Sequence, residues 1–125
     1  MKYCLLLLSL FLCLTLHAQQ DSVATEGMRT KTGYATYYAK KFEGRRTTSG
    51  KKYRGHKLTA AHLSLPFGTV VTVRNLSNGK MVDVVVNDRG PFTKRYIIDL
   101  SEHAAKKLGF WKMGQSKVEI SYHIE

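Results

Sequence analysis

Asp88 carries the carboxyl group best suited to chemistry in this sequence. It lies in Asn87-Asp-Arg-Gly-Pro91, directly after a run of valines. A carboxyl group can release a proton in one step and take one up in the next, as general acid and then general base. The first role requires a pKa above the ordinary value of about 3.9, and we expect apolar neighbours such as Val86 and Phe92 to raise it. The same residues also form ordinary turns, so a structural role for Asp88 stays open.

His62 is a second candidate for proton transfer. It follows Thr59-Ala-Ala in an apolar stretch, where a hydrogen-bonded structural histidine is more common than a catalytic one. We expect neither a metal site nor a cofactor, because no paired ligand spacing occurs among His56, His62, His103 and His123.

Residues 1–18 have the layout of a secretory signal peptide. Lys2 provides the positive charge, residues 5–16 are almost wholly apolar, and Ala18 offers a cleavage point before polar residues. The apolar run is shorter than the roughly 20 residues that a membrane-spanning helix needs. Lipid attachment at Cys13 is not expected, because bulky Leu12 precedes it. The sequence therefore predicts an exported protein whose cysteines are lost with the leader, which excludes thiol chemistry.

The chain is strongly basic. It carries 20 Lys+Arg against 9 Asp+Glu, a formal net charge of +11 at pH 7, and only Lys2 of these cations lies in the leader. Such a field attracts polyanions, whether nucleic acid, anionic lipid or acidic wall polymer. Since we expect export, nucleic acid is the poorest of these partners and wall polymer the most natural.

Turn residues and short β-prone runs must position these candidates. We expect a flexible lead-in over residues 19–32 and one domain over 33–125. Residues 40–56 are basic, rich in Gly, Thr and Ser, and almost free of aliphatic side chains. This composition predicts a long surface loop, and loops of such length usually serve function.

Alternating valines predict a hairpin in the middle of the domain. Residues 71–74 and 82–86 alternate around Asn78-Gly79, a pair that suits a tight turn. Residues 96–100 predict another strand, and residues 118–124 alternate as a half-buried last strand does.

One short helix is expected after the strand at residues 96–100. Ser101 can cap it, Glu102 suits its first turn, and Gly109 can end it. We expect the Asp99 carboxylate to be structural and hydrogen-bonded near the helix start. Many short strands with one short helix predict a small closed barrel.

The ordered motifs of the chain resemble those of the rare lipoprotein A (RlpA-like) family. The resemblance covers about residues 33–109, in the order and spacing of that family. Its motifs are Gly33-Tyr-Ala-Thr-Tyr-Tyr38, Gly44-Arg-Arg-Thr-Thr-Ser-Gly50, Leu58-Thr-Ala-Ala-His62, Leu65-Pro-Phe-Gly-Thr69, Val73-Arg-Asn-Leu76, Asn87-Asp-Arg-Gly-Pro-Phe92 and Ile97-Ile-Asp-Leu-Ser101.

The resemblance implies a mainly β fold, a six-stranded double-psi β-barrel with one or two short helices. It implies an endolytic lytic transglycosylase of the periplasm or cell envelope. Such an enzyme cuts MurNAc–GlcNAc bonds of peptidoglycan, in strands stripped of stem peptides, and leaves 1,6-anhydroMurNAc ends. In this family Asp88 aligns with the proposed acid, and His62 is expected beside it. Substrate contacts are expected from Tyr38, Thr47, Ser49, Tyr53, Asn87 and Arg89.

The sequence departs from the family pattern at one functional position. The family usually has a glutamate, proposed to help catalysis, where this chain has Lys51. Glu43, where relatives often have histidine, is a possible replacement carboxylate. The departure weakens the prediction of an enzyme.

A non-catalytic glycan-binding or wall-loosening module of expansin type is the alternative. Lys51 favours it, as do tyrosines that can stack on sugar rings, although Tyr37 is as well explained by packing on the barrel. Under either interpretation we expect a monomer whose partner is peptidoglycan rather than nucleic acid. The cations of the long loop either attract the anionic wall or form a solvated face; they are Lys40, Lys41, Arg45, Arg46, Lys51, Lys52, Arg54 and Lys57.

Overall fold

A computed structural model describes residues 27–124. Its barrel lies within one compact unit, Arg29–His123. The expected signal peptide and its two cysteines lie outside the described residues. Within these residues no helix is both long and apolar enough to cross a bilayer. The elements are β1 (Met28–Tyr37), the 3-10 helix η1 (Lys40–Phe42), β2 (Thr59–Ala61), β3 (Val70–Asn75), β4 (Met81–Asp88), β5 (Tyr96–Leu100), α2 (Glu102–Leu108) and β6 (Ser116–His123).

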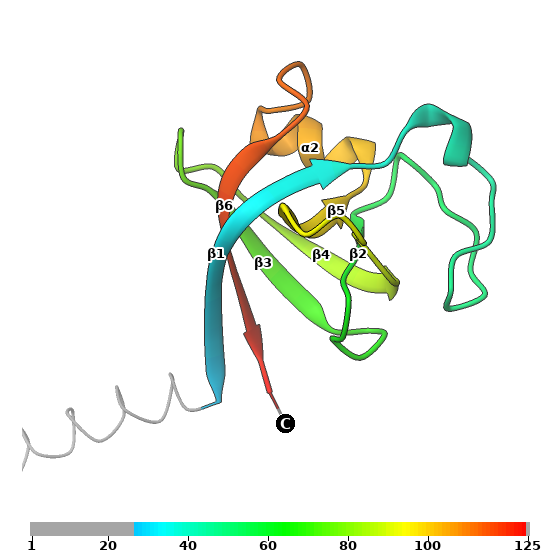
Figure 1. The fold of residues 1–125 in the computed structure, drawn as a ribbon, viewed down its shortest axis with the longest axis horizontal. Helices are drawn as coiled ribbons and strands as arrows, with labels where there is room; N and C mark the ends of the chain where they lie inside the picture. Colours follow the sequence, from blue (N-terminus) through cyan, green and yellow to red (C-terminus); the bar gives the residue numbers. More distant parts are fainter. Residues whose placement is uncertain (1–26, 125) are drawn as a thin grey trace, which may run out of the picture. The chain divides into compact units, whose positions relative to one another are not determined.

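The six strands close into a barrel in the order β1-β5-β2-β4-β3-β6 (Figure 1). Two of the seams, β1/β5 and β2/β4, are parallel, and β2/β5, β3/β4 and β3/β6 are antiparallel. Parallel pairs require crossovers, so strands distant in sequence become neighbours. The closed barrel predicted from the strand pattern, and the six-stranded double-psi type implied by the family resemblance, are confirmed.

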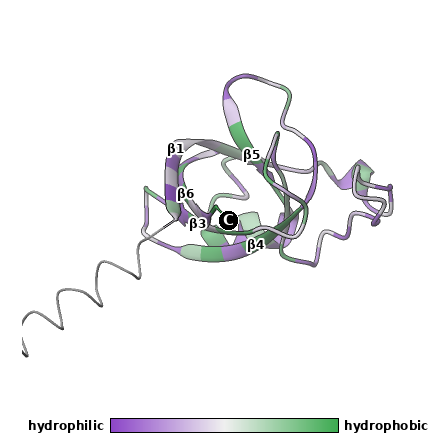
Figure 2. Ribbon diagram, turned by 90° about the horizontal axis from the view of Figure 1, so that it is seen from below, coloured by the Kyte–Doolittle hydropathy of each residue, from purple (hydrophilic) through white to green (hydrophobic). Residues whose placement is uncertain are grey.

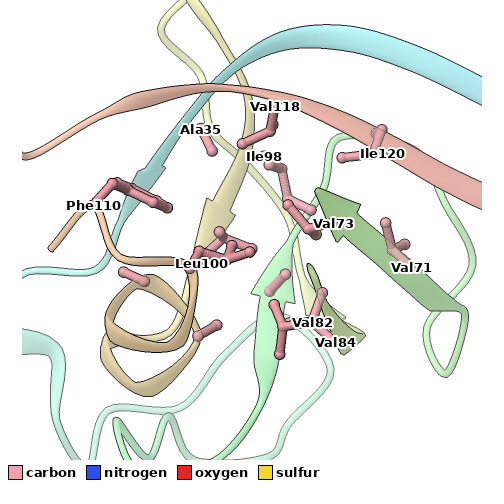
Figure 3. Close-up of a cluster of buried hydrophobic side chains, with 14 of the residues drawn as sticks. Ala35, Val71, Val73, Val82, Val84, Ile98, Leu100, Phe110, Val118 and Ile120 are labelled. Atoms are coloured by element: carbon pink, nitrogen blue, oxygen red, sulfur yellow. The ribbon is translucent and has the colours of Figure 1, made fainter. Parts of the chain in front are cut away.

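Alternating side chains fill the barrel. In β4, Val82, Val84 and Val86 are buried while the residues between them are exposed, and strands around the ring carry both hydrophobic and hydrophilic segments (Figure 2). Branched side chains from β3, β4, β5 and β6 point toward one another in the centre, and Phe110 closes the cluster beside α2 (Figure 3). Because the inward faces of the strands pack this core, side chains that act on a ligand must project from the outer faces.

The hairpin of β3 and β4 has the expected pairing but a longer turn. Val73 pairs with Val82 and Arg74 with Met81, and the connection between the strands runs over residues 76–80, so it is not a two-residue turn. Gly79 takes a positive φ of 78°, which glycine adopts at no steric cost. The side chain of Asn78 donates to the carbonyl oxygen of Leu108 at 3.0 Å, which draws the turn toward the end of α2.

The helix begins and ends as predicted. The Ser101 hydroxyl accepts a hydrogen bond from the Ala104 amide, and Gly109 ends the helix in the left-handed conformation. Buried Asn75 links the helix to the barrel, because its Nδ2 donates to the Leu108 carbonyl at 2.8 Å and its Oδ1 accepts from the Ser116 hydroxyl at 2.9 Å.

Two segments differ from expectation. β1 begins at Met28, so residues 28–32, expected as lead-in, are strand. Thr59–Ala61, which was not predicted as a strand, forms β2 in the wall between β4 and β5. Residues 39–58 form the expected long loop, which projects from the barrel (Figure 1); it contains η1 and a single antiparallel bridge between Arg46 and Lys52.

Candidate active site

Three neighbouring strands bring two carboxyl groups to one face of the barrel. Ala61 of β2 is the register partner of Asp88 in β4 and of Asp99 in β5. Partnered positions project to the same face of a sheet, so Asp99 shares the face of Ala61. In β4 the register shifts between Ala60 and Ala61, whose partners are Val86 and Asp88; this irregularity turns Asp88 to the face of Ala61, although it follows inward-facing Val86 by two residues. This is the outer face, because the adjacent Ala60 belongs to the barrel core.

Three hydrogen bonds hold the carboxylate of Asp88. Tyr38 Oη donates to Oδ2 at 2.5 Å, and Oδ1 accepts the backbone amides of Thr48 at 2.8 Å and Arg89 at 2.9 Å. The donors come from the residue that follows β1, from the long loop and from the residue that follows Asp88. The Thr48 amide was not identified from the sequence, since nothing in a threonine's type marks its backbone as a donor.

These donors keep Asp88 ionised. Burial alone would raise the pKa of Asp88, but the hydrogen bonds from Tyr38, Thr48 and Arg89 outweigh it and hold the pKa below its ordinary value. Burial, followed by the charge of Asp88, raises the pKa of Tyr38, so the shared proton stays on the phenol. The expectation that apolar neighbours raise the pKa of Asp88 is wrong, because polar donors surround its oxygens.

Tyr38 and Tyr53 are buried against each other. Their rings stack with centroids 4.2 Å apart, and they expose 9% and 3% of their surfaces. Tyr53 Oη accepts the Glu102 amide at 3.2 Å, which connects the loop to the start of α2. Neither ring offers the free face that the expected stacking on a sugar requires. Tyr37 also packs on the barrel, and its hydroxyl donates to the Trp111 carbonyl at 2.6 Å.

The turn at residues 47–51 rests against the end of β4. Buried Thr47 bonds through Oγ1 to the Ser49 hydroxyl at 2.8 Å and to the Lys51 carbonyl at 2.6 Å. The Ser49 amide donates to the Asn87 carbonyl at 3.3 Å. Thr47, Ser49 and Asn87, which the sequence predicts as substrate contacts, therefore lie close to Asp88, and their visible role is to fix the turn that presents the Thr48 amide.

His62 lies next to Asp88 through its backbone and not through its ring. Its amide donates to the Asp88 carbonyl at 3.1 Å, whereas its Nδ1 accepts the amides of Ser64 and Leu65, each at 3.1 Å. Burial, and then the charges of Lys31 and Arg89, lower the pKa of His62. The ring is thus a neutral acceptor at neutral pH, committed to the turn after β2.

Arg89 braces the same turn. Its Nη1 donates to the carbonyls of His62 at 3.2 Å and Leu65 at 2.7 Å, and its guanidinium carbon lies 4.0 Å from the ring centroid of Phe67. Only its backbone amide bonds to Asp88, so the guanidinium is directed away from the carboxylate.

The structure also shows the surroundings of Lys51, which occupies the position of the family glutamate, and of Glu43, the possible replacement. Lys51 is exposed, and its amide donates to the Ser49 hydroxyl at 3.4 Å. Glu43 accepts the Gly55 amide at 2.8 Å and lies 3.9 Å from the Arg54 guanidinium. The contacts of the Glu43 carboxylate thus lie within the long loop, and no hydrogen bond joins it to Asp88 among the described residues.

Asp99 differs from its expected structural role. Its Oδ1 is buried and has no hydrogen-bond partner, so the expected hydrogen bond near the helix start is wrong. Burial first, and then the negative charge of Asp88, raise the pKa of Asp99 to about 7. Within residues 27–124, no group of three or more His, Cys, Asp or Glu side chains is arranged to hold a metal ion.

The family described as lytic transglycolase matches residues 30–120. The chain belongs to this family. Among curated members, the endolytic peptidoglycan transglycosylase RlpA of Neisseria meningitidis serogroup A is 50% identical over 91 residues, which are 73% of this chain and 38% of that protein. The Rickettsia bellii protein of the same name is 47% identical over 100 residues, 77% of this chain and 44% of that protein. The chain thus spans less than half the length of these lytic transglycolase relatives.

Solved structures support the fold of this lytic transglycolase domain. Streptomyces papain inhibitor superposes with a TM-score of 0.62 at 24% identity, covering 77% of this chain and 96% of the inhibitor. Clavibacter michiganensis expansin, solved with cellohexaose, superposes with a TM-score of 0.61 at 21% identity, covering 78% of this chain and 51% of the expansin. Identities this low show a common barrel and nothing about a shared ligand.

Proposed function

We propose that this protein is an endolytic peptidoglycan lytic transglycosylase of the cell envelope. It cuts MurNAc–GlcNAc bonds in peptide-stripped glycan strands and leaves 1,6-anhydroMurNAc ends. Support comes from relatives near 50% identity that carry the name endolytic peptidoglycan transglycosylase. The observation that carries the proposal is the Asp88 carboxylate, held by donors from Tyr38, Thr48 and Arg89 on the outer face of the barrel.

The reaction requires a carboxylate in this state. As the glycosidic bond breaks, positive charge develops at the anomeric carbon, and the 6-hydroxyl of the muramoyl residue loses its proton. An ionised Asp88 stabilises that charge and accepts that proton as general base. His62 supports Asp88 by fixing the end of β2, whose neighbour is the aspartate.

Substrate contacts fall to residues that flank Asp88. Thr47, Ser49, Asn87 and Arg89 form the adjoining turns. Tyr38 instead holds the carboxylate through its hydroxyl, and Tyr53 supports Tyr38 by stacking on its ring. We assign sugar stacking to two exposed rings instead. Phe92 is 82% exposed and lies four residues after Asp88, and Phe67 packs against the guanidinium of Arg89.

Digestion of purified sacculi tests the proposal. We expect the wild-type protein to release anhydromuramyl ends, detected by mass spectrometry, and to act faster on amidase-treated sacculi. Asp88→Asn should lose at least 100-fold in this release while still sedimenting with sacculi. No anhydromuramyl ends from the wild type, under conditions in which a known transglycosylase makes them, would contradict the proposed function.

A non-catalytic expansin-like module is the second candidate. The ionised state of Asp88 favours it, because such a carboxylate cannot protonate a leaving group, and so does Lys51 in place of the family glutamate. If it is correct, wild type and Asp88→Asn sediment with sacculi equally and neither releases anhydromuramyl ends.

Lys51 lowers turnover under the leading proposal. Restoring a carboxylate with Lys51→Glu is expected to raise the initial rate of anhydromuramyl release several-fold. Lys52→Glu serves as the matched control, because Lys52 is also exposed in the same loop. An equal effect of both variants would indicate a change in net charge and not a restored catalytic group.

A further inference from the structure

A transglycosylase needs a proton donor for the leaving oxygen, and the groups already described do not supply one. Asp88 is ionised by its three donors. The ring of His62 is neutral, because its pKa is lowered and its Nδ1 accepts two amides, so it carries no acidic proton. Glu43 is bound to the Gly55 amide and near Arg54. The family glutamate is absent because Lys51 occupies its place. The donor must therefore be another group near Asp88.

We propose that Asp99 is the general acid of this reaction and that Asp88 is its carboxylate partner. The inference rests on the transglycosylase function proposed above and adds a division of labour to it. Ala61 lies between the two aspartates as the register partner of both. Two strand spacings of about 4.8 Å separate their Cα atoms by roughly 10 Å, and partnered side chains project to the same outer face.

The surroundings of Asp99 favour a neutral carboxyl. Its Oδ1 is sealed from solvent without any donor, whereas an ionised oxygen in that place would go unsatisfied at considerable cost. The residue as a whole keeps partial exposure, which leaves Oδ2 to carry the transferable proton. Asp88 and Asp99 therefore sit in opposite environments, one rich in donors and one without them, and such pairs divide acid and base roles.

The titratable groups that interact electrostatically with Asp99 are Asp88 from β4, Tyr38 directly after β1 and Tyr53 from the loop. Burial of Asp99 first, and then the negative charge of Asp88, raise the pKa of Asp99 to about 7. The negative charge of Asp99 acts in turn on both tyrosines. Among the described residues no cation forms an ion pair with Asp99.

The proposed step balances in protons and bonds. Asp99 gives its proton to the glycosidic oxygen as the bond from that oxygen to the anomeric carbon breaks. The 6-hydroxyl oxygen of the same muramoyl residue bonds to that carbon, and its proton passes to Asp88. Asp88 then releases this proton to solvent while Asp99 takes one up, and no water is consumed.

A substrate with an activated leaving group tests this assignment. We expect Asp99→Asn to lose at least 100-fold of its rate on sacculi but to stay within about tenfold of wild type on a 4-nitrophenyl glycoside of a muramoyl-terminated oligosaccharide, because 4-nitrophenolate leaves without protonation. Asp88→Asn should lose activity on both substrates. The matched control is Asp83→Asn, because Asp83 is an exposed carboxylate on β4, the strand of Asp88. This variant should keep its activity on both substrates.

The possible failures are distinguishable. An inactive wild type overturns the transglycosylase function itself. An active wild type with equally active Asp99→Asn overturns only the role of Asp99, as does equal loss on both substrates. Carbon-13 NMR titration of the wild-type carboxyl groups requires no variant to fold, and an Asp99 that titrates in the ordinary range near 3.9 also overturns the proposal.

Discussion

Tyr38 links the carboxyl group of Asp88 to the rest of the fold. Its ring stacks on Tyr53 and its hydroxyl bonds to Asp88, so one side chain combines packing with control of charge. The two functions can be separated, because phenylalanine keeps the ring and removes the donor.

We predict that Tyr38→Phe moves the acidic limb of the activity profile to higher pH. Activity requires ionised Asp88, and loss of the phenol donor raises the pKa of Asp88. The measurement is the rate of anhydromuramyl release between pH 4 and 8. Tyr34→Phe, whose ring is 38% exposed, should leave the limb unchanged, and an unmoved limb in Tyr38→Phe would refute the prediction.

Asp99 predicts an unusual dependence of stability on pH. Its folded pKa of about 7 lies above the unfolded value. The folded state therefore binds more protons between about pH 4 and 7, and the free energy of unfolding from this group falls as pH rises through that window. Asp99→Asn removes this loss. The free energy of unfolding of the variant, minus that of the wild type, should therefore be larger at pH 8 than at pH 4 by a few kcal/mol.

Denaturant unfolding at pH 4 and pH 8 measures this difference. Asp83→Asn is the control, since Asp83 is exposed and accepts a hydrogen bond from the Thr72 hydroxyl. The same stability difference between Asp99→Asn and wild type at both pH values would show that Asp99 does not hold its proton.

The candidate site could be predicted only in part from the sequence. Asp88 and the Asn87-to-Phe92 motif identified the position, because a carboxyl group at the end of a strand is visible as a residue type. The state of Asp88 was not visible, since its donors Tyr38 and Thr48 come from residues 50 and 40 positions away. Burial of Asp99 depends on the same distant packing.

At the scale of the elements, Asn75 connects three of them. This buried residue of β3 donates to the end of α2 and accepts from Ser116 at the start of β6. We predict that Asn75→Ala lowers the free energy of unfolding by roughly 2–4 kcal/mol, because it leaves buried polar groups unpaired.

Denaturant unfolding compared with Asn78→Ala checks this. Asn78 donates to the same Leu108 carbonyl but is exposed, so its loss should cost less than about 1 kcal/mol. Equal effects of the two variants would contradict the linking role of Asn75.

Elements with strong local signals were predicted well. Alternating valines identified β3 and β4, and Ser101 and Gly109 marked the ends of α2. The strand β2 was missed because it has three residues, two of them alanines with little β preference. The start of β1 was missed because residues 28–32 are exposed and show no alternating burial.

At the scale of the whole molecule, charge governs the approach to a polyanionic wall. The net charge of +11 and the exposed cations of the loop at residues 39–58 predict attraction that salt screens. Binding to sacculi should weaken by roughly tenfold between 0.1 M and 1 M salt, over which the Debye length shrinks from about 10 Å to about 3 Å.

Sedimentation of the protein with sacculi at several salt concentrations measures this attraction. A Lys51→Gln, Lys52→Gln double variant should show a shallower dependence on salt, and Asp83→Asn should not. Binding that does not change with salt concentration would show that the cations of the basic loop form only a solvated face and do not attract the wall.

The place of β6 in the ring has a consequence for when the protein becomes competent. β6 is the last of the six barrel strands in chain order, and it pairs with β3 to complete the wall. A nascent or clipped chain without Ser116–His123 already contains Asp88 and Asp99, yet it leaves β3 with an open edge and Asn75 without Ser116. Proteolytic removal of this one strand would therefore inactivate the protein without a cut near its carboxyl groups.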